Sequence, residues 1–282
     1  DLMQINFTKM HGLGNDFMVL DLCSQPMELS AEKIRELSDR HFGIGFDQLL
    51  QIEKASSDDV DFDYRIFNAD GDEVEHCGNG ARCFAKYVYD KKLSTKNPIR
   101  VKTPNRTLSL LRLENGEVTV DMEKPVFETL SIPFVSDSDT ATYRRTLKIG
   151  GDNVEVEFSA LSMGNPHAVI VVDDVDKAEV ERIGIALGSH SDFPEGVNVG
   201  FMQILDRSTI NLRVYERGAG ETLACGTGAC AAVVAGCRRG LLDDTVRAIL
   251  RGGELSINWQ QNDEPVLMTG PAETAYEGTI EI

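Results

Sequence analysis

The sequence lacks several features that define other classes of protein. No apolar run approaches the roughly 20 residues that a membrane-spanning helix needs. Acidic residues outnumber basic ones by 46 to 28, for a net charge of −18, and no cluster of lysine or arginine stands out. Nucleic-acid binding draws on clustered positive charge. The sequence therefore predicts a protein that has no membrane span and no nucleic-acid partner.

Targeting and cofactor signals are also missing. The N-terminus has no basic region followed by an apolar core, as a signal peptide would, so a cytoplasmic protein is expected. Asp1 and Leu2 before Met3 are typical of a cloning remnant. Gly12 and Gly14 are weak indicators of phosphate binding, and the glycine-rich fingerprint of a dinucleotide site is absent.

Cysteine is sparse, and its spacing excludes the usual structural roles. None of the six cysteines forms a C-x-x-C pair, which makes a four-ligand zinc site improbable, and a chain of 282 residues with so few cysteines does not resemble a disulfide-stapled secreted domain. We expect Cys83 and Cys230 in the core, and we expect Cys23 and Cys237 to serve packing.

The two remaining cysteines occupy matched motifs. The first motif reads CGNGARC from Cys77, and the second reads CGTGACA from Cys225. Each precedes an apolar run with helical spacing, which predicts a helix that begins at the motif with unpaired backbone N–H groups. Such a helix start favours anions and thiolates, so two activated thiols with lowered pKa are expected. For each cysteine alone, a buried structural thiol is the commoner case; the matched context favours catalysis.

The elements around these motifs occur in the same order twice. In the first half we predict strands at 5–7 and 17–20 around a turn-rich loop at 11–16, a helix capped by Ser30 and ended by Gly43, and strands at 47–53 and 62–67. In the second half we predict strands at 154–158 and 168–172, a helix capped by Asp176 with Glu179 completing a capping box, and strands at 197–205 and 209–215. Residues 123–145 are predicted to be a loop-rich connection.

Spacing supports an internal repeat. From Asn15 to Cys77 is 62 positions (77 − 15), and from Asn165 to Cys225 is 60 (225 − 165). We therefore predict an α+β fold of two pseudo-symmetric domains, each a mostly antiparallel sheet wrapped around a central helix. The expected domains are 3–123, joined by a C-terminal strand at 273–282, and 124–272.

Two thiols at facing helix starts would suit inversion of a carbon next to a carboxylate. One thiolate would remove the α-proton from one face, and the other thiol would return a proton to the opposite face. Both helix starts would stabilise the charge that spreads onto the carboxylate. His167 and Glu216 are candidates for biasing which thiol is ionised.

The full motif set resembles the diaminopimelate epimerase family. It comprises HGLGNDF at 11–17, NADG at 68–71, CGNGARC at 77–83, GNPH at 164–167, ERG at 216–218 and ACGTGAC at 224–230. The cysteine motifs alone would also fit the wider proline-racemase-like superfamily. The resemblance runs from Met3 to the C-terminus and implies cofactor-independent, metal-free conversion of LL- to meso-diaminopimelate on the bacterial lysine and cell-wall route.

The resemblance also implies roles for individual residues. It marks Cys77 and Cys225 as the proton-transferring pair, with His167 and Glu216 tuning the thiols, and it implies a homodimer with Tyr276 at the contact. The substrate contacts that it implies are Asn15, Gln48, Asn68, Gly78, Asn79, Asn165, Asn198, Glu216, Arg217, Gly226 and Thr227.

Other hypotheses stay open on the sequence. A racemase for proline, hydroxyproline or another single-headed amino acid is disfavoured by Arg217 with Asn198, since the planar fork of Arg217 suits a second carboxylate. A thiol-disulfide redox protein fits poorly because the two helix starts are far apart in the sequence. A binding module without catalysis is the last alternative. Asparagines near turns commonly satisfy only the backbone, Glu216 with Arg217 could be a surface ion pair, and Tyr276 could be ordinary strand core.

Overall fold

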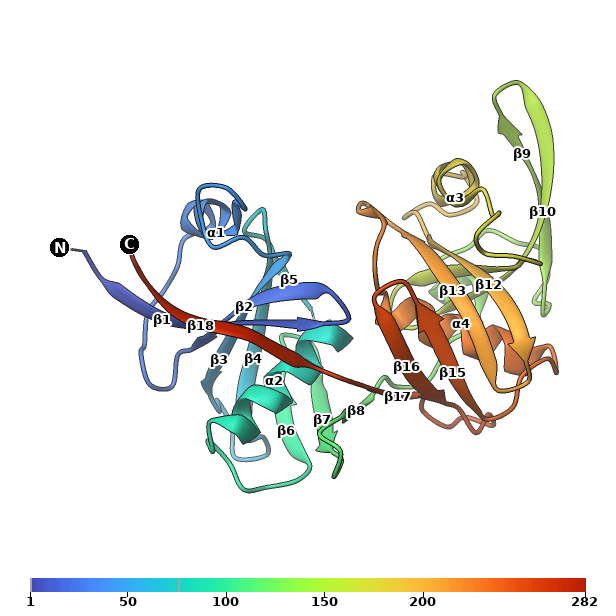
Figure 1. The fold of residues 1–282 in the computed structure, drawn as a ribbon. Helices are drawn as coiled ribbons and strands as arrows, with labels where there is room; N and C mark the ends of the chain where they lie inside the picture. The colour runs from blue at the N-terminus through green and yellow to red at the C-terminus, as the bar shows by residue number, and fades with distance from the viewer. Residues whose placement is uncertain (1, 76) are drawn as a thin grey trace. The chain divides into compact units, whose positions relative to one another are not determined.

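The computed structural model describes residues 2–75 and 77–282 and divides into two compact units. Unit 1 comprises residues 1–121 and 269–282, and unit 2 comprises residues 122–268. Each unit has a sheet and two helices, labelled in Figure 1. The prediction of two pseudo-symmetric α+β halves is confirmed, because the strands of the two units pair in the same sequence of parallel and antiparallel steps.

The described residues of unit 1 form nine strands and two helices. The strands are β1 (Gln4–Gly12), β2 (Asn15–Asp21), β3 (Gln48–Lys54), β4 (Phe62–Asn68), β5 (Glu73–Val74), β6 (Ile99–Lys102), β7 (Thr107–Arg112), β8 (Val118–Asp121) and β18 (Glu273–Glu281). The helices are α1 (Ala31–Ser38) and α2 (Gly78–Asp90). Strands β2 and β3 are parallel, as are β4 and β6, while β18 pairs antiparallel with β1. Helix α2 packs against β1, β7 and β8, so the sheet curves around it (Figure 1).

Unit 2 repeats this plan. Its strands are β9 (Tyr143–Ile149), β10 (Asp152–Ser162), β11 (Pro166–Val171), β12 (Asn198–Asp206), β13 (Thr209–Glu216), β14 (Gly220–Glu221), β15 (Thr245–Leu250) and β16 (Gly253–Asn258). The helices are α3 (Val180–Gly188) and α4 (Gly226–Arg238), with a short 3₁₀ turn η1 (Thr129–Ser131). Strand β17 (Leu267–Gly270) runs across the boundary between the units. Helix α4 is buried almost all round, which its alanine- and glycine-rich sequence permits, because small side chains let the strands approach closely.

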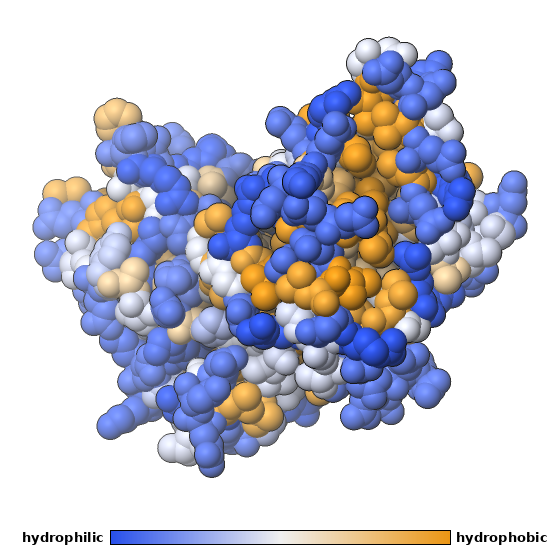
Figure 2. Space-filling model, turned by 45° about the vertical axis from the view of Figure 1, so that its right-hand side comes forward, coloured by the Kyte–Doolittle hydropathy of each residue, from blue (hydrophilic) through white to orange (hydrophobic). Residues whose placement is uncertain are grey.

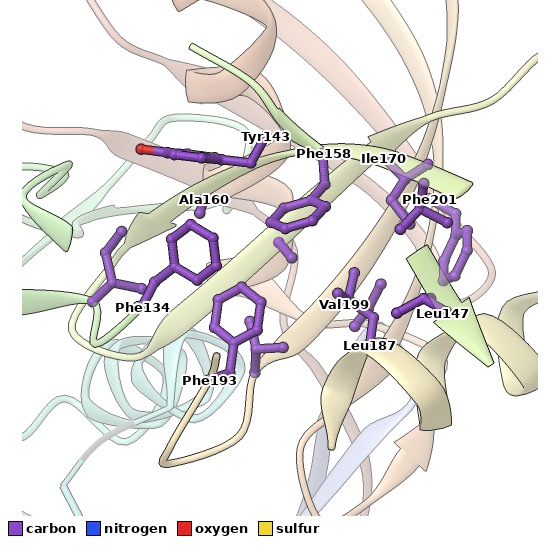
Figure 3. Packing of buried hydrophobic residues seen from close by; sticks show 14 of the residues in the cluster. Phe134, Tyr143, Leu147, Phe158, Ala160, Ile170, Leu187, Phe193, Val199 and Phe201 are labelled. Carbon is purple, nitrogen blue, oxygen red and sulfur yellow. The ribbon is translucent and has the colours of Figure 1, made fainter. Parts of the chain in front are cut away.

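The core of unit 2 has an aromatic centre. Phe134 stacks on Phe193 with ring centroids 4.6 Å apart and meets Tyr143 edge-on at 4.8 Å. Phe158 packs edge-on against Phe134 at 5.7 Å (Figure 3). These rings belong to one hydrophobic cluster with Leu187 of α3 and Val199 of β12, and Phe134 joins the segment before β9 to this cluster.

Two local predictions are wrong and a third is sharpened. The turn-rich loop predicted at 11–16 is a tight hairpin, because Leu13 (φ 55°) and Gly14 (φ 86°) make a two-residue turn that matches the strand twist. Helix α3 begins at Val180 and not after Asp176, because the N–H of Asp176 is held by the side chain of Asp174 in a separate turn. Strand β9 starts inside the segment expected to be loop-rich.

The first predicted helix is confirmed at its start. Ser30 is the N-cap of α1, and its hydroxyl accepts a hydrogen bond from the N–H of Lys33 at 3.1 Å. The helix ends at Ser38, earlier than Gly43. A Cβ at Gly43 would lie 2.3 Å from the carbonyl oxygen of Glu36, so only glycine allows the chain to turn back there.

Polar side chains cover most of the face shown in Figure 2. Apolar atoms gather in a patch right of its centre. Among the described residues, no helix combines the length and apolar character required to cross a bilayer.

Candidate active site

In unit 1, Cys77 stands at the start of the central helix, as the sequence predicts. It is the N-cap of α2, with extended backbone angles and no capping bond from its side chain. Its N–H donates to the Tyr64 hydroxyl at 3.2 Å, and that hydroxyl lies 3.3 Å from the Cys77 carbonyl oxygen. A Cβ at Gly80 would lie 2.9 Å from the Tyr64 hydroxyl. The second glycine of the motif therefore leaves room for the tyrosine that fixes the helix start.

Two asparagines lie beside this cysteine. The side-chain oxygen of Asn15, at the first position of β2, accepts from Cys77 Sγ at 3.4 Å and from Asn79 Nδ2 at 3.1 Å. Asn79 Oδ1 in turn accepts from Arg82 Nη2 at 2.8 Å. Arg82 is fully buried and also donates to the carbonyl oxygen of Gly78 at 3.2 Å. Arg82 thus fixes the first turn of α2 from inside.

Gln48 and Asn68 form a second polar pair in unit 1. They face each other in register where β3 begins and β4 ends, and Gln48 Nε2 donates to Asn68 Oδ1 at 3.0 Å. Gln48 Oε1 is buried and has no hydrogen-bond partner among the described residues. A buried acceptor without a partner costs free energy, so this oxygen is available to a donor from a ligand.

In unit 2, Cys225 stands at the start of α4 but is held differently. Its Sγ accepts a hydrogen bond from the N–H of Gly228 at 3.3 Å, so the thiol caps its own helix, and Thr227 Oγ1 lies 3.7 Å from the sulfur. A Cβ at Gly228 would lie 3.1 Å from this sulfur. Gly226 begins the helix between Cys225 and Thr227.

Asn165 and His167 extend from this helix start. His167 Nε2 and Asn165 Oδ1 are 2.8 Å apart, so the imidazole donates to the amide oxygen. Asn165 Nδ2 then donates to Thr227 Oγ1 at 3.3 Å. His167 is 1% exposed, and burial, with a smaller contribution from the positive charge of Arg217, lowers its pKa to about 3. The imidazole is therefore neutral at neutral pH.

The remaining site residues of unit 2 lie where β12 begins and β13 ends. Buried Asn198 accepts from the N–H of Arg217 at 2.8 Å and donates to the carbonyl oxygen of Pro166 at 3.0 Å. The Arg217 guanidinium is exposed and donates to the carbonyl oxygen of Glu195 at 2.9 Å. The Glu216 carboxylate accepts a short hydrogen bond from the Thr222 hydroxyl.

The expectation of a lowered thiol pKa is wrong for Cys225. Burial and the negative charge of Glu216 raise the pKa of this thiol well above its ordinary value. Hydrogen bonds from Thr227 and Gly228 oppose the shift without cancelling it. The helix start alone does not activate a thiol that is desolvated beside a carboxylate.

Other predicted residues lie apart from the helix starts. Tyr276 lies on β18, 48% exposed, edge-on to Phe7 with ring centroids 6.0 Å apart. Cys83 and Cys230 are fully buried in the two central helices. Within residues 2–75 and 77–282, no group of three histidine, cysteine or acidic side chains is placed to hold a metal ion.

Some residues that support the site were missed on the sequence. Tyr64 and Arg82 fix the start of α2, Thr222 holds Glu216, and Asp47 holds Asn15. The one sequence signal for Asp47 was its position directly before Gln48, a predicted substrate contact. Its contact with Asn15 follows from the parallel pairing of β2 and β3, which no local pattern reveals.

Comparison with known proteins gives the family. A sequence model described as diaminopimelate epimerase matches residues 7–128 and 159–275. The chain belongs to the diaminopimelate epimerase family. A protein of Nitrosomonas europaea named diaminopimelate epimerase is 56% identical over 99% of this chain and 100% of its own length. The protein of that name from Ectopseudomonas mendocina is 54% identical, also over 99% and 100%.

Solved structures resemble the chain in fold alone. A hydroxyproline epimerase from Agrobacterium vitis, with bound trans-4-hydroxy-L-proline, has a TM-score of 0.71 at 14% identity, covering 99% of this chain and 93% of its own. A PhzF-family phenazine biosynthesis protein from Bacillus anthracis has a TM-score of 0.69 at 16% identity, covering 99% and 100%. The predicted fold class and the predicted membership of the diaminopimelate epimerase family are confirmed, and the chain is an enzyme of the racemase and epimerase type.

Proposed function

We propose that the protein converts LL-2,6-diaminopimelate to meso-2,6-diaminopimelate by a two-base mechanism without a cofactor, in bacterial lysine and peptidoglycan precursor biosynthesis. The observation that carries this proposal is the pair of equivalent helix starts, each with a cysteine as N-cap. Family membership and relatives above 50% identity with that name support the substrate. Each unit supplies one thiol.

The reaction needs one base and one acid. A thiolate takes the α-proton and becomes a thiol, leaving a carbanion whose charge spreads onto the carboxylate. The second thiol gives its proton to the opposite face and becomes a thiolate, so proton and charge balance without an oxidant. Backbone N–H groups at a helix start stabilise the developing negative charge.

We assign Cys225 as the thiol that begins as the acid and Cys77 as the base for one direction of the reaction. The raised pKa of Cys225 supports this assignment, because a buried thiol beside a carboxylate keeps its proton. The roles exchange in the reverse direction.

Glu216 and His167 tune the site in different ways. Glu216 acts by charge, because its carboxylate raises the Cys225 pKa. His167 carries no charge near neutral pH, since its pKa is lowered to about 3, and it acts through the hydrogen bond to Asn165.

The remaining polar residues hold the substrate. A substrate with two amino-acid ends needs donors for carboxylates and acceptors for ammonium groups, which amide side chains and a guanidinium supply. The residues proposed to contact it are Asn15, Gln48, Asn68, Gly78, Asn79, Asn165, Asn198, Glu216, Arg217, Gly226 and Thr227. The unsatisfied oxygen of Gln48 supports its place in this set.

We further propose a cytoplasmic homodimer with Tyr276 at its contact. Cys23, Cys83, Cys225 and Cys237 are not joined in disulfides, which suits a reducing compartment. Strand β18 is exposed along most of its length, and an exposed strand of this kind pairs readily with a second copy. Light scattering on wild type and Tyr276→Ala would check it: we expect a dimer and a weakened dimer, and a monomeric wild type would contradict the proposal.

Proton NMR in heavy water tests the proposed reaction. Reduced protein with LL-diaminopimelate should lose the α-proton signal as solvent deuterium is incorporated, and meso product should form. A parallel panel of proline and hydroxyproline should show no exchange. Exchange of the single-headed substrates alone would favour the racemase alternative, and tight binding of diaminopimelate without exchange would favour a binding module.

A further inference from the structure

The equivalent asparagines of the two units are held in opposite orientations. In unit 2, His167 donates to the oxygen of Asn165, so the NH₂ group of that amide faces Thr227 at the helix start. In unit 1, the NH₂ group of Asn15 points away from the helix start, and its oxygen faces Cys77. In unit 1 the NH₂ group of Asn79 donates to the Asn15 oxygen, and the two units also differ in the residue behind each amide.

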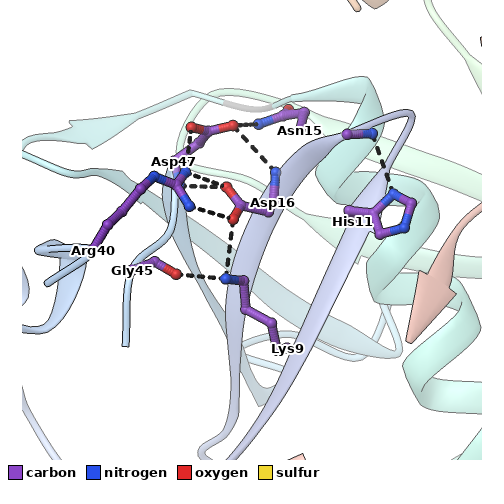
Figure 4. Close-up of polar contacts among 8 residues, drawn as sticks. Lys9, His11, Asn15, Asp16, Arg40, Gly45 and Asp47 are labelled. Carbon is purple, nitrogen blue, oxygen red and sulfur yellow. Dashed lines mark hydrogen bonds and ion pairs between the residues drawn. The ribbon is translucent and has the colours of Figure 1, made fainter. Parts of the chain in front are cut away.

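Behind Asn15 stands the carboxylate of Asp47. Asn15 Nδ2 donates to Asp47 Oδ2 at 3.1 Å (Figure 4). An ionised carboxylate can only accept hydrogen bonds, so it selects the NH₂ end of the amide and turns the oxygen toward Cys77. The N–H of Asp16 also donates to Asp47 Oδ2, at 3.2 Å.

Asp47 is itself held by a charged network. Arg40 donates to Asp47 Oδ1 at 3.0 Å and to both oxygens of Asp16 at 2.8 and 2.9 Å, and Lys9 lies 3.0 Å from Asp16 (Figure 4). Burial alone would raise the pKa of Asp16, but hydrogen bonds from Arg40 and Lys9 hold it well below its usual range. Lys9 also donates to the carbonyl oxygen of Gly45, which fixes the segment that carries Asp47. The Asp16 carboxylate therefore stays ionised near neutral pH, and Arg40 ties it to Asp47.

Unit 2 has no counterpart of this network. Gln48 and Asn198 occupy equivalent positions in the two units, since each is the first residue of its strand to pair with the preceding parallel strand. The residue equivalent to Asp47 is therefore Val197, and the residue equivalent to Asp16 is Pro166. Neither side chain can accept a hydrogen bond from an amide. In unit 2 the hydrogen bond from His167 orients the amide of Asn165.

We propose that Asp47, held by Arg40, is a positioning residue that fixes the amide of Asn15 so that an acceptor, and not a donor, faces the thiol of Cys77. The proposal rests on the proposed function only for the importance of Cys77 in catalysis. An acceptor at this place receives the proton of Sγ–H, whereas an amide NH₂ would donate to the thiolate and favour ionisation. Asp47 thus favours the protonated form of Cys77 in the free protein, and this thiol must lose its proton before it can act as the base.

Two substitutions at Asp47 separate this effect from a change of charge. Asp47→Asn and Asp47→Ser remove the same negative charge. In Asp47→Asn, the guanidinium of Arg40 can only donate, so it keeps the side-chain oxygen of the new asparagine. The NH₂ group of that asparagine then faces Asn15, and we expect the Asn15 amide to turn over in response. In Asp47→Ser the hydroxyl can still accept from Asn15. Asp59→Asn, an exposed aspartate of the same unit whose carboxylate accepts from Ser57, is the control for the charge change.

The measurement is the ratio of iodoacetamide alkylation rates at Cys77 and Cys225, read by mass spectrometry in one sample at fixed pH. We expect Asp47→Asn to raise this ratio about tenfold, Asp47→Ser to raise it no more than about threefold, and Asp59→Asn to leave it unchanged. A merely structural role would alter the two cysteines together.

An unchanged ratio in folded Asp47→Asn, or an equal rise in both Asp47 variants, would overturn the proposal. If Asp47→Asn does not fold, the side-chain NH₂ resonance of Asn15 in wild type decides: a signal sensitive to titration of the Asp47 carboxylate supports the proposal, and insensitivity contradicts it. If the wild-type protein exchanges no α-hydrogen of diaminopimelate, the proposed function is contradicted. The alkylation test of Asp47 remains valid in that case, because it does not depend on turnover.

Discussion

The two helix starts share a backbone and differ in the groups around the sulfur. Cys77 makes no capping bond, and its Sγ–H points to a neighbouring amide oxygen, while Cys225 caps its own helix and is buried beside a carboxylate. A reaction that inverts a stereocentre needs one proton acceptor and one proton donor at the same moment. The comparison teaches that a symmetric fold can carry this asymmetry in a few side chains.

Those side chains are found by aligning the repeats on their cysteines. Nine positions before the cysteine stand Asn68 and Glu216, and three positions before it stand Val74 and Thr222. Only unit 2 therefore has a carboxylate at this place and a hydroxyl to hold it.

The largest expected effect comes from removing either thiol. Cys77→Ala and Cys225→Ala should each lower epimerisation at least about 10³-fold, since each removes an obligatory proton carrier, and the double variant should lose little more. Cys23→Ala, whose thiol has a pKa raised to about 11 by burial and nearby acidic groups, is the control and should stay active. If either single variant retained a tenth of the activity, that thiol would not be an obligatory proton carrier, and the two helix starts would not have equivalent roles.

Acid should destabilise the two units at different pH. Because the folded pKa of His167 is about 3, below its ordinary 6.5, the unfolded state binds the proton first, and stability falls as pH drops below 6.5. From pH 7 to 4.5 unfolding of unit 2 should become easier by about 2–3 kcal/mol. The lowered pKa of Asp16 in unit 1 costs stability only below its ordinary 3.8.

Amide hydrogen exchange at pH 7 and 4.5 would compare the units directly. We expect α4 to lose protection before α2. His167→Phe, which places in unit 2 the residue type that Phe17 provides in unit 1, should remove this part of the pH dependence. Earlier opening of α2 in the wild type would contradict the assignment.

The smallest effect should follow from removing the charge at Glu216. Glu216→Gln should lower the pKa of Cys225, because the carboxylate is one cause of its elevation, so alkylation of Cys225 should become faster at pH 8. Cys77 serves as the internal reference, and Glu181→Gln, on the exposed side of α3, is the control. An unchanged alkylation rate of Cys225 would mean that burial alone sets its pKa.

The sequence predicted what depends on local pattern. The central helices follow from glycine and cysteine before an apolar run, and Ser30 caps α1 as expected. The turn-rich character of 11–16 was predicted, but the exact place of the turn at Leu13 was not, because a leucine at positive φ gives no signal. The pKa of Cys225 and the link from Asp47 to Asn15 depend on burial and on strand pairing, which join residues distant in the sequence. The roles of the substrate-contacting residues stay predictions.

Strand β18 bears on how the chain acquires its structure. Unit 2 is one continuous stretch, but the sheet of unit 1 includes β18, whose partner β1 lies at the other end of the chain. During synthesis the N-terminal stretch emerges first, yet its sheet cannot be completed until β18 has left the ribosome. Closing this pairing encloses all of unit 2 in one loop, a non-local step that slows folding. The unit that is begun first is therefore the unit that is finished last.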